Sequence, residues 1–181
     1  MNKKPTIVSK KTIYNAKYLK LDEVEVALYN NKKKTYSIAS RSPAVYILPL
    51  TKNNELYLIS QYRFMYEKRR RELIAGYIDE KEDPLTAAKR ELIEEAGIRA
   101  KKWTLIANTE MSGSIINSNL YFYLAQELEI SKAQPEEDED IVVLKTSMQD
   151  AVDQVMENRI TDLGSKFGIL MVNQLQLQNK I

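Results

Sequence analysis

The sequence contains neither cysteine nor histidine among its 181 residues. The absence of cysteine excludes disulfides, thiolate metal sites and a cysteine nucleophile. The absence of histidine excludes a Ser-His-Asp triad, imidazole ligands for zinc and the most common general base. Catalysis by this chain must therefore rest on carboxylates, lysines, tyrosines or a bound metal ion.

Long hydrophobic runs are also missing. No stretch approaches the roughly 20 apolar residues that span a bilayer, and the start at Met1–Pro5 lacks the apolar segment of a signal peptide. The net charge is only +2 and the basic residues are spread along the chain, unlike those of a dedicated nucleic-acid binder. We expect a cytoplasmic protein with no membrane or nucleic-acid partner that acts on a small molecule.

The N-terminal part of the chain predicts a β-hairpin. Residues 19–39 alternate between apolar and polar on both sides of Asn30-Asn31, which is a turn signal. A hairpin alone is marginally stable, so it must pack on the main body or on a second copy of the chain. We therefore expect residues 1–40 to form an N-terminal β-element that supports a homodimer, and residues 41–181 to form the main domain.

The rest of the chain interleaves strand and helix patterns. Short apolar runs predict strands, and runs with helical periodicity and start signals predict helices. The strands are expected at 44–50, 56–63, 72–77, 103–108, 119–126 and 141–146, and the helices at 84–96, 147–158 and 163–174. This order predicts an α/β sandwich in which helices cover a mixed sheet. Residues 66–71 read as a charged loop, either simply solvated or attracting phosphate.

The helix at residues 84–96 has clear boundary signals. Asp83 can cap its start, Pro84 suits the first helical position, and Gly97 suits the left-handed position after its end. Residues advance about 100° each on a helix, so one apolar stripe faces the core. That stripe consists of Leu85, Ala88, Leu92 and Ala96.

Three glutamates lie together beside this stripe: Glu91, Glu94 and Glu95. They could form an ordinary solvated acidic face. However, they occupy the last turns, where the helix dipole disfavours negative charge, and Glu91 and Glu95 are close enough to repel each other. A hard divalent cation, Mg²⁺ or Mn²⁺, would remove both penalties. We therefore expect a metal site on this face.

The spacing around this helix resembles the Nudix box. Gly76 is followed after five residues by Glu82, and after seven more by Arg90-Glu91-Leu92-Ile93-Glu94-Glu95-Ala96-Gly97-Ile98. The resemblance implies an α/β/α sandwich with a mixed sheet, in which the glutamates hold divalent cations that polarise a substrate pyrophosphate. It implies that residues 41–181 form a Nudix catalytic domain.

The same resemblance implies roles for individual residues. Glu91 and Glu95 become metal ligands, Glu94 a further ligand or water contact with a part in catalysis, and the Ala75 carbonyl a backbone ligand. Glu82 and Arg90 become partners that fix the geometry of the ligands. An ordinary surface salt bridge is the alternative for those two residues.

Outside the box, the chain resembles the ADP-ribose pyrophosphatase branch of the family. The resemblance is carried by Gln61-Tyr62-Arg63 and by Glu72-Leu73-Ile74-Ala75-Gly76. It implies that the N-terminal element aids dimerisation and contributes to the partner's site. It also implies substrate contacts and a catalytic base, although each candidate could also be a charge at the surface. The contacts are Arg41, Arg63 and Glu72, and Glu139, within the acidic run at 136–140, is the base.

Two departures from the branch bear on the substrate. After the box the chain reads Ser112-Gly113-Ser114, without the proline typical of members that prefer ADP-ribose, and Ser118 falls where they carry glutamate. Ile74 replaces a proline that commonly precedes the Ala-Gly pair. These changes leave the metal chemistry intact but leave the preference for ADP-ribose open.

The predicted function is magnesium-dependent hydrolysis of the pyrophosphate in a nucleoside diphosphate sugar such as ADP-ribose, giving a nucleoside monophosphate and a sugar phosphate; manganese could replace magnesium. One alternative is hydrolysis of nucleoside triphosphates or dinucleoside polyphosphates. Another is a module that binds ADP-ribose without cutting it. The intact set of box glutamates argues against the binding module.

Overall fold

A computed structural model describes residues 4–131 and 140–181 of the chain, which divide into two compact units. The first unit comprises Met1–Pro43 and Thr109–Asn119, and the second comprises Ala44–Asn108 and Leu120–Ile181. The sequence analysis did not predict that residues 109–119 belong with the N-terminal part.

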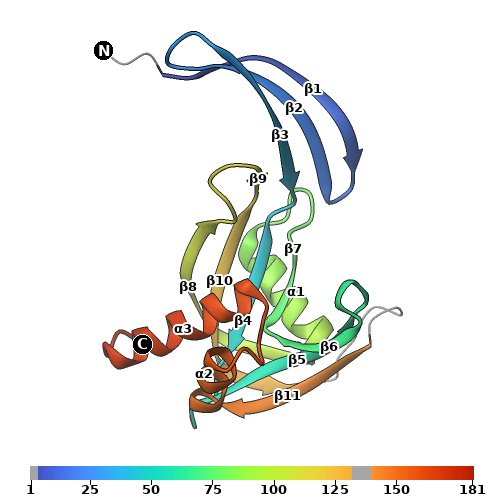
Figure 1. Cartoon of the computed structure of the whole chain (residues 1–181). Helices are drawn as coiled ribbons and strands as arrows, with labels where there is room; N and C mark the ends of the chain where they lie inside the picture. The colour runs from blue at the N-terminus through green and yellow to red at the C-terminus, as the bar shows by residue number, and fades with distance from the viewer. Residues whose placement is uncertain (1–3, 132–139) are drawn as a thin grey trace. The chain divides into compact units, whose positions relative to one another are not determined.

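The first unit is a small sheet in the order β1-β2-β3-β9. Strands β1 (Thr6–Ala16), β2 (Leu19–Ala27) and β3 (Lys33–Arg41) are antiparallel neighbours, and β9 (Ile116–Asn117) runs parallel to β3 (Figure 1). Strands β2 and β3 form the hairpin expected from the sequence. Strand β1 was not expected, because all 11 of its residues are exposed and no buried face imposes an alternating pattern.

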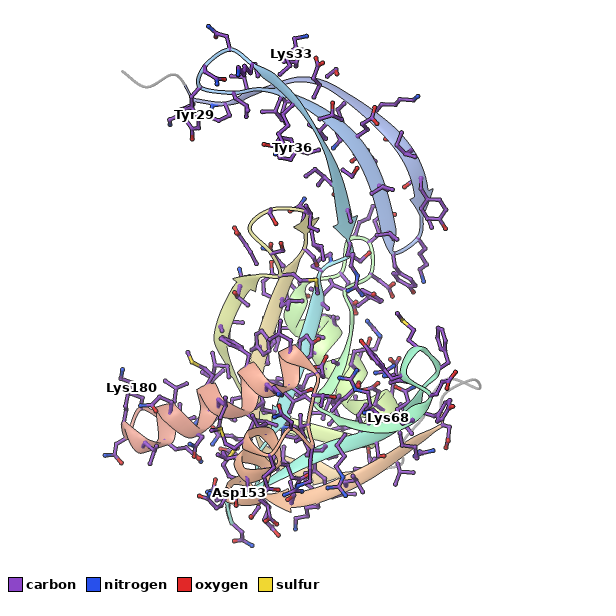
Figure 2. The ribbon with its side chains drawn as sticks, viewed as in Figure 1. Tyr29, Lys33, Tyr36, Lys68, Asp153 and Lys180 are labelled. Carbon is purple, nitrogen blue, oxygen red and sulfur yellow. The ribbon has the colours of Figure 1, made fainter. Side chains whose placement is uncertain are left out.

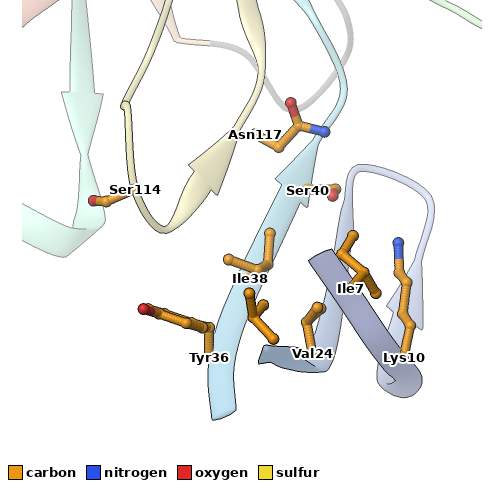
Figure 3. A pocket seen from close by; sticks show the side chains of 9 residues that line it. Ile7, Lys10, Val24, Tyr36, Ile38, Ser40, Ser114 and Asn117 are labelled. Carbon is orange, nitrogen blue, oxygen red and sulfur yellow. The ribbon is translucent and has the colours of Figure 1, made fainter. Parts of the chain in front are cut away.

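A hollow within the first unit is lined by apolar side chains such as Val24 and Ile38 and by polar ones such as Tyr36 and Asn117 (Figure 3). Asp22, in contrast, is fully buried in the same sheet. Its carboxylate accepts a 2.7 Å hydrogen bond from Thr12 Oγ1 and lies 3.0 Å from Lys10 Nζ. Burial raises the pKa of Asp22, but these partners outweigh burial and the pKa lies below its ordinary value.

The second unit contains two sheets, in the orders β7-β4-β10-β8 and β11-β5-β6, and three α-helices. Strand β4 is parallel to β10 and antiparallel to β7, so the first of these sheets is mixed. The strands are β4 (Ala44–Pro49), β5 (Glu55–Arg63), β6 (Lys68–Glu72), β7 (Ile74–Tyr77), β8 (Ile98–Glu110), β10 (Asn119–Ile130) and β11 (Ile141–Ser147). The helices are α1 (Pro84–Ala96), α2 (Met148–Met156) and α3 (Leu163–Leu177), with a 3-10 turn at Phe64–Tyr66.

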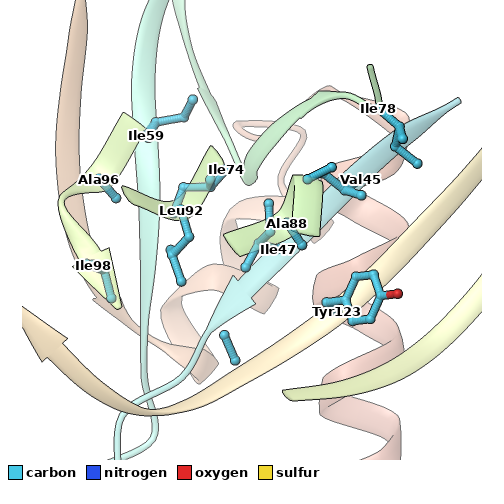
Figure 4. Packing of buried hydrophobic residues seen from close by; sticks show 12 residues of the cluster. Val45, Ile47, Ile59, Ile74, Ile78, Ala88, Leu92, Ala96, Ile98 and Tyr123 are labelled. Atoms are coloured by element: carbon cyan, nitrogen blue, oxygen red, sulfur yellow. The ribbon is translucent and has the colours of Figure 1, made fainter. Parts of the chain in front are cut away.

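Two hydrophobic clusters fill the spaces between the helices and the strands of the second unit. One packs α1 against strand residues such as Val45, Ile47 and Ile74 (Figure 4). The other packs α2 and α3 against residues such as Leu48 and Leu58. Successive side chains of a strand point to opposite faces, which is why neighbours on one strand enter different clusters. The result is the expected α/β/α sandwich, confirmed for this unit.

The boundaries of α1 agree with the sequence prediction. The Asp83 carboxylate accepts hydrogen bonds of 3.1 Å from the backbone N–H groups of Leu85 and Thr86, and Gly97 ends the helix at φ 63°. Side-chain capping and a left-handed glycine are local effects, so they can be read from sequence.

The prediction of a charged loop at residues 66–71 was wrong. Residues 68–72 form β6, which pairs antiparallel with β5 from Arg63↔Lys68 to Ile59↔Glu72. Pairing with a neighbouring strand overrides the low strand propensity of a basic run. Among the helices of the described residues, none is long and apolar enough to cross a membrane.

Candidate active site

The candidate site is built on α1 and the strand beside it, β7. The Glu91 carboxylate lies against the backbone of Gly76. A Cβ at position 76 would be 1.9 Å from Glu91 Oε1, so any side chain there would displace this carboxylate. Gly76 is not left-handed, so the requirement for glycine is one of space.

Glu95 lies one turn further along α1 and meets the same strand. It is only 4% exposed, and its Oε2 accepts a 3.1 Å hydrogen bond from the Ala75 N–H. A buried carboxylate near the C-terminal end of a helix is unfavourable both for desolvation and for the helix dipole. The fold nevertheless places Glu91 and Glu95 along two consecutive residues of β7.

Arg90 connects the acidic residues around α1. Its Nη1 donates to Glu91 Oε1 at 2.7 Å and to Glu94 Oε2 at 3.0 Å. Its Nε and Nη2 donate to the two oxygens of Glu82, each at 3.0 Å, and Nη2 also donates to the Tyr77 carbonyl at 3.0 Å. The guanidinium therefore fixes three carboxylates and one backbone carbonyl relative to one another.

The electrostatics of this network follow from its hydrogen bonds. The bonds to Glu82 are the largest cause of the raised pKa of Arg90, with Glu91 and Glu94 adding to it. Conversely, Arg90 holds the pKa of Glu82 below its ordinary value, although burial acts in the opposite direction. Glu82 also accepts a 3.1 Å bond from the Asp79 N–H, which ties the loop before α1 to the network.

The donors on α1 suit a hard divalent cation in their chemistry. Glu91, Glu94 and Glu95 offer only carboxylate oxygens, which Mg²⁺ and Mn²⁺ prefer, and Ala75 adds a backbone carbonyl on the strand that both Glu91 and Glu95 touch. Arg90 is hydrogen-bonded to two of the three glutamates. Within residues 4–131 and 140–181, no three acidic side chains converge as a ready-made metal-binding group.

A second cluster of charges lies on β5 and β6. Arg63 donates to Glu72 Oε2 through Nη2 at 2.6 Å and through Nε at 3.1 Å. Burial lowers the pKa of Arg63, but Glu72 outweighs it and the pKa is raised. Glu95 contributes to this rise, so Arg63 lies within electrostatic reach of the α1 site. The structure also brings Arg70 to this cluster, which sequence reasoning missed because the residue was assigned to a loop.

Three further residues singled out by the sequence analysis are Arg41, Ser118 and Glu139. Arg41 belongs to the first unit, where its Nη1 lies 3.9 Å from Met111 Sδ. Ser118, also in that unit, donates to the Ser42 carbonyl at 3.2 Å. Glu139 lies outside the described residues. Its neighbour Asp140 is described and forms an ion pair with Arg69, whose Nη2 also donates to the Asp140 carbonyl at 3.0 Å.

Comparison with known proteins gives a consistent result. Residues 40–162 match the family described as NUDIX domain. An ADP-ribose pyrophosphatase of Bacillus subtilis is 29% identical, covering 90% of this chain and 89% of its own. A methanol dehydrogenase activator of Bacillus methanolicus is 28% identical over 93% of this chain and 91% of its own.

Among solved structures, the crystal structure of an ADP compounds hydrolase has a similar fold. It superposes with a TM-score of 0.86 and covers 100% of this chain and 99% of its own, with 24% identity. At that identity the likeness concerns the fold alone.

Proposed function

Because this chain belongs to the NUDIX family and is a pyrophosphohydrolase of that family, we propose that it cleaves the pyrophosphate of a nucleoside diphosphate sugar of the ADP-ribose type. The products are a nucleoside monophosphate and a sugar phosphate. The observation that carries the proposal is the placement of Glu91 and Glu95 along Gly76 and Ala75 of β7. The named activity of the Bacillus subtilis relative supports the substrate class.

Enzymes of this family generally use a divalent metal, and we propose magnesium, with manganese as a substitute. Glu91, Glu94, Glu95 and the Ala75 carbonyl would hold it. When bound, the ion would neutralise charge on the substrate pyrophosphate and activate a water molecule. Two residues near the ligands, Glu82 and Arg90, keep the acidic side chains in place through the hydrogen bonds described above.

The remaining roles concern the substrate and the proton. Arg63 and Glu72, with Arg41 of the first unit, would contact the nucleotide sugar. Glu139 would accept a proton from water as water attacks phosphorus. Glu94 would be a second carboxylate that takes part in catalysis. The bond from that phosphorus to the bridging oxygen breaks, and the bridging oxygen leaves with the other phosphate.

We also propose that the protein is a homodimer joined through its first unit. Supporting this is the long strand β1, whose 11 residues are all exposed and which, among the described strands, pairs with β2 alone. An unpaired edge of this length favours association with another chain.

A substrate panel tests the proposed function. The full chain is incubated with magnesium and ADP-ribose, other nucleoside diphosphate sugars, nucleoside triphosphates or dinucleoside polyphosphates, and the products are identified. We expect a nucleoside monophosphate and a sugar phosphate from the first two groups. Turnover of triphosphates alone would overturn the substrate class, and binding of ADP-ribose with no turnover of any substrate would favour a binding module.

A further inference from the structure

Strand pairing places the cluster of charges on a defined face of the β5–β6 ribbon. Ile59, Gln61 and Arg63 lie opposite Glu72, Arg70 and Lys68, and cross-strand partners share one face. Lys68, at the start of β6, is labelled in Figure 2. Ile59 belongs to the hydrophobic cluster of α1, so the charged face of the ribbon is the one directed toward α1.

Glu72 lies between two arginines on this face. Its Oε2 accepts from Arg63, as described above, and its Oε1 lies 3.3 Å from Arg70 Nε. The side chains of Glu72 and Arg70 are each only 10% exposed, whereas that of Arg63 is 40% exposed. Two positive charges against one negative charge leave a net charge of +1, and the accessible member of the cluster is Arg63.

The buried position of the Arg70 guanidinium is energetically unfavourable. The Nε atom is buried and makes no hydrogen bond with any described residue, and the guanidinium stacks on the Tyr66 ring with 4.4 Å between its central carbon and the ring centroid. Removing one member of a buried ion pair is destabilising when it leaves the other charge without a partner, but Glu72 keeps the two hydrogen bonds from Arg63 when Arg70 is replaced. Glu72 is already paired with Arg63, so its neutralisation does not require Arg70. A buried charge that is energetically unfavourable, and that the stability of the fold does not require, indicates a functional role for Arg70.

Two other carboxylates influence Arg63, and both are engaged elsewhere. Glu95 accepts from the Ala75 N–H, and Asp162 caps α3 by accepting from the Ser165 N–H at 2.7 Å and Ser165 Oγ at 2.8 Å. The carboxylate that accepts hydrogen bonds directly from Arg63 is that of Glu72. The surroundings of Glu72 therefore influence how strongly Arg63 attracts an anion.

We propose that Arg70 is a positioning residue for anion binding: because Glu72 is already paired with Arg63, the charge of Arg70 leaves the cluster of Arg63, Glu72 and Arg70 with one net positive charge, and Arg63, its accessible member, presents that charge to a phosphate of the substrate. This inference rests on the proposed function, because it takes a pyrophosphate compound as the ligand. Arg70 acts through Glu72 and Arg63 and does not itself contact the substrate.

The test compares Arg70→Met with Arg70→Lys and with Arg71→Met as a matched control. Arg71 lies on the same strand but on the opposite face, where its Nη1 donates to Gln154 at 2.7 Å. Arg70→Met and Arg71→Met each remove one positive charge, from adjacent positions on opposite faces of β6, whereas Arg70→Lys keeps the charge. The comparison therefore separates a general effect of charge from one that depends on the face directed toward α1. Titration calorimetry measures binding of inorganic pyrophosphate without metal, and kinetics measure KM and kcat with ADP-ribose and magnesium.

In Arg70→Met we expect pyrophosphate binding to weaken about fivefold or more, from the loss of one nearby charge in a partly buried site. KM should rise by a similar factor with little change in kcat, while the urea midpoint of unfolding stays the same or increases. Arg70→Lys should restore most of the affinity, and Arg71→Met should leave it within about twofold of the wild type.

Three results would overturn the inference: unchanged pyrophosphate affinity in Arg70→Met, an equal loss in Arg71→Met, or a loss that follows a lowered unfolding midpoint and is not rescued by lysine. The calorimetry does not depend on turnover. If the wild-type chain hydrolyses no substrate but Arg70→Met still weakens pyrophosphate binding, the proposed function fails and the role of Arg70 stands.

Discussion

Among the proposed metal-binding glutamates, Glu95 is the most deeply buried. Only 4% of it is exposed, and it accepts a hydrogen bond from the Ala75 N–H. A glutamine can accept the same bond through its amide oxygen but is a poor ligand for a hard cation. The Glu95→Gln substitution therefore tests metal binding while keeping the hydrogen bond that the folded chain makes.

We expect Glu95→Gln to lower kcat with ADP-ribose and magnesium by about a hundredfold or more, since even outer partners of metal ligands contribute 10–100-fold. The urea midpoint of unfolding should change little. Glu127→Gln, at an exposed position, is the control and should keep wild-type turnover. Turnover by Glu95→Gln equal to the wild type would show that Glu95 is not a metal ligand.

Gly76 leaves the space that the Glu91 carboxylate occupies. In Gly76→Ala the new Cβ would lie 1.9 Å from Glu91 Oε1, so the carboxylate must move. We expect weaker binding of Mn²⁺, measured by titration calorimetry, together with a loss of turnover. Gly113→Ala is the matched control, because a Cβ there meets no atom within 4 Å. Equal Mn²⁺ affinity in both variants would show that the position of Glu91 does not matter for the metal.

Helix α3 packs against Leu73, the residue that joins β6 to β7. Ser165 is fully buried, and its Oγ accepts a 2.9 Å hydrogen bond from the Leu73 N–H. Gly168 leaves room for Leu73, since a Cβ there would lie 2.8 Å from Leu73 Cδ1. Leu73 stands between Glu72 and the β7 residues of the site, so α3 supports the segment that carries both charge clusters.

Replacing Ser165 by alanine leaves the buried Leu73 N–H without its acceptor. We expect Ser165→Ala to lower the free energy of unfolding by about 1–3 kcal/mol, the usual cost of an unsatisfied buried donor. Urea denaturation measures this change. The control is Ser112→Ala, because the hydrogen bonds of the exposed Ser112 are local to its own loop. A Ser165→Ala variant as stable as Ser112→Ala would contradict the importance of this contact.

In both units, carboxyl groups of the described residues have pKa values below their ordinary values of 3.8 for aspartate and 4.5 for glutamate. Among them are Asp22, Glu55, Glu82 and Asp83. In the unfolded chain these groups take up protons at a higher pH than in the folded chain. Their contribution to stability is present above the ordinary pKa values and is lost as the pH falls through the folded ones.

We therefore expect the thermal unfolding midpoint to decrease steadily as the pH is lowered from about 5 to below the ordinary carboxyl pKa values. Calorimetric scans between neutral pH and acid measure this dependence. In Glu82→Gln, which removes one of these groups, the decrease should be shallower. A midpoint that rises on acidification would mean that these carboxylates are not stabilised as anions in the fold.

Helix α1 and the character of its acidic face could be predicted from the amino-acid sequence alone. The cap at Asp83, the end at Gly97 and the alignment of Glu91, Glu94 and Glu95 all depend on interactions within one turn or on helical periodicity. The absence of cysteine and histidine restricted catalysis to carboxylates, lysines, tyrosines or a bound metal ion in the same way, because composition does not depend on folding.

The groups that meet in space could be identified only from the folded chain. The clearance between Gly76 and Glu91 depends on how a strand packs on a helix, and the position of Glu72 between Arg63 and Arg70 depends on the register of β5 and β6. Contacts of this kind join residues distant in sequence, so no local pattern encodes them. For the same reason β6 was taken for a loop, and residues 109–119 were not expected to join the N-terminal unit.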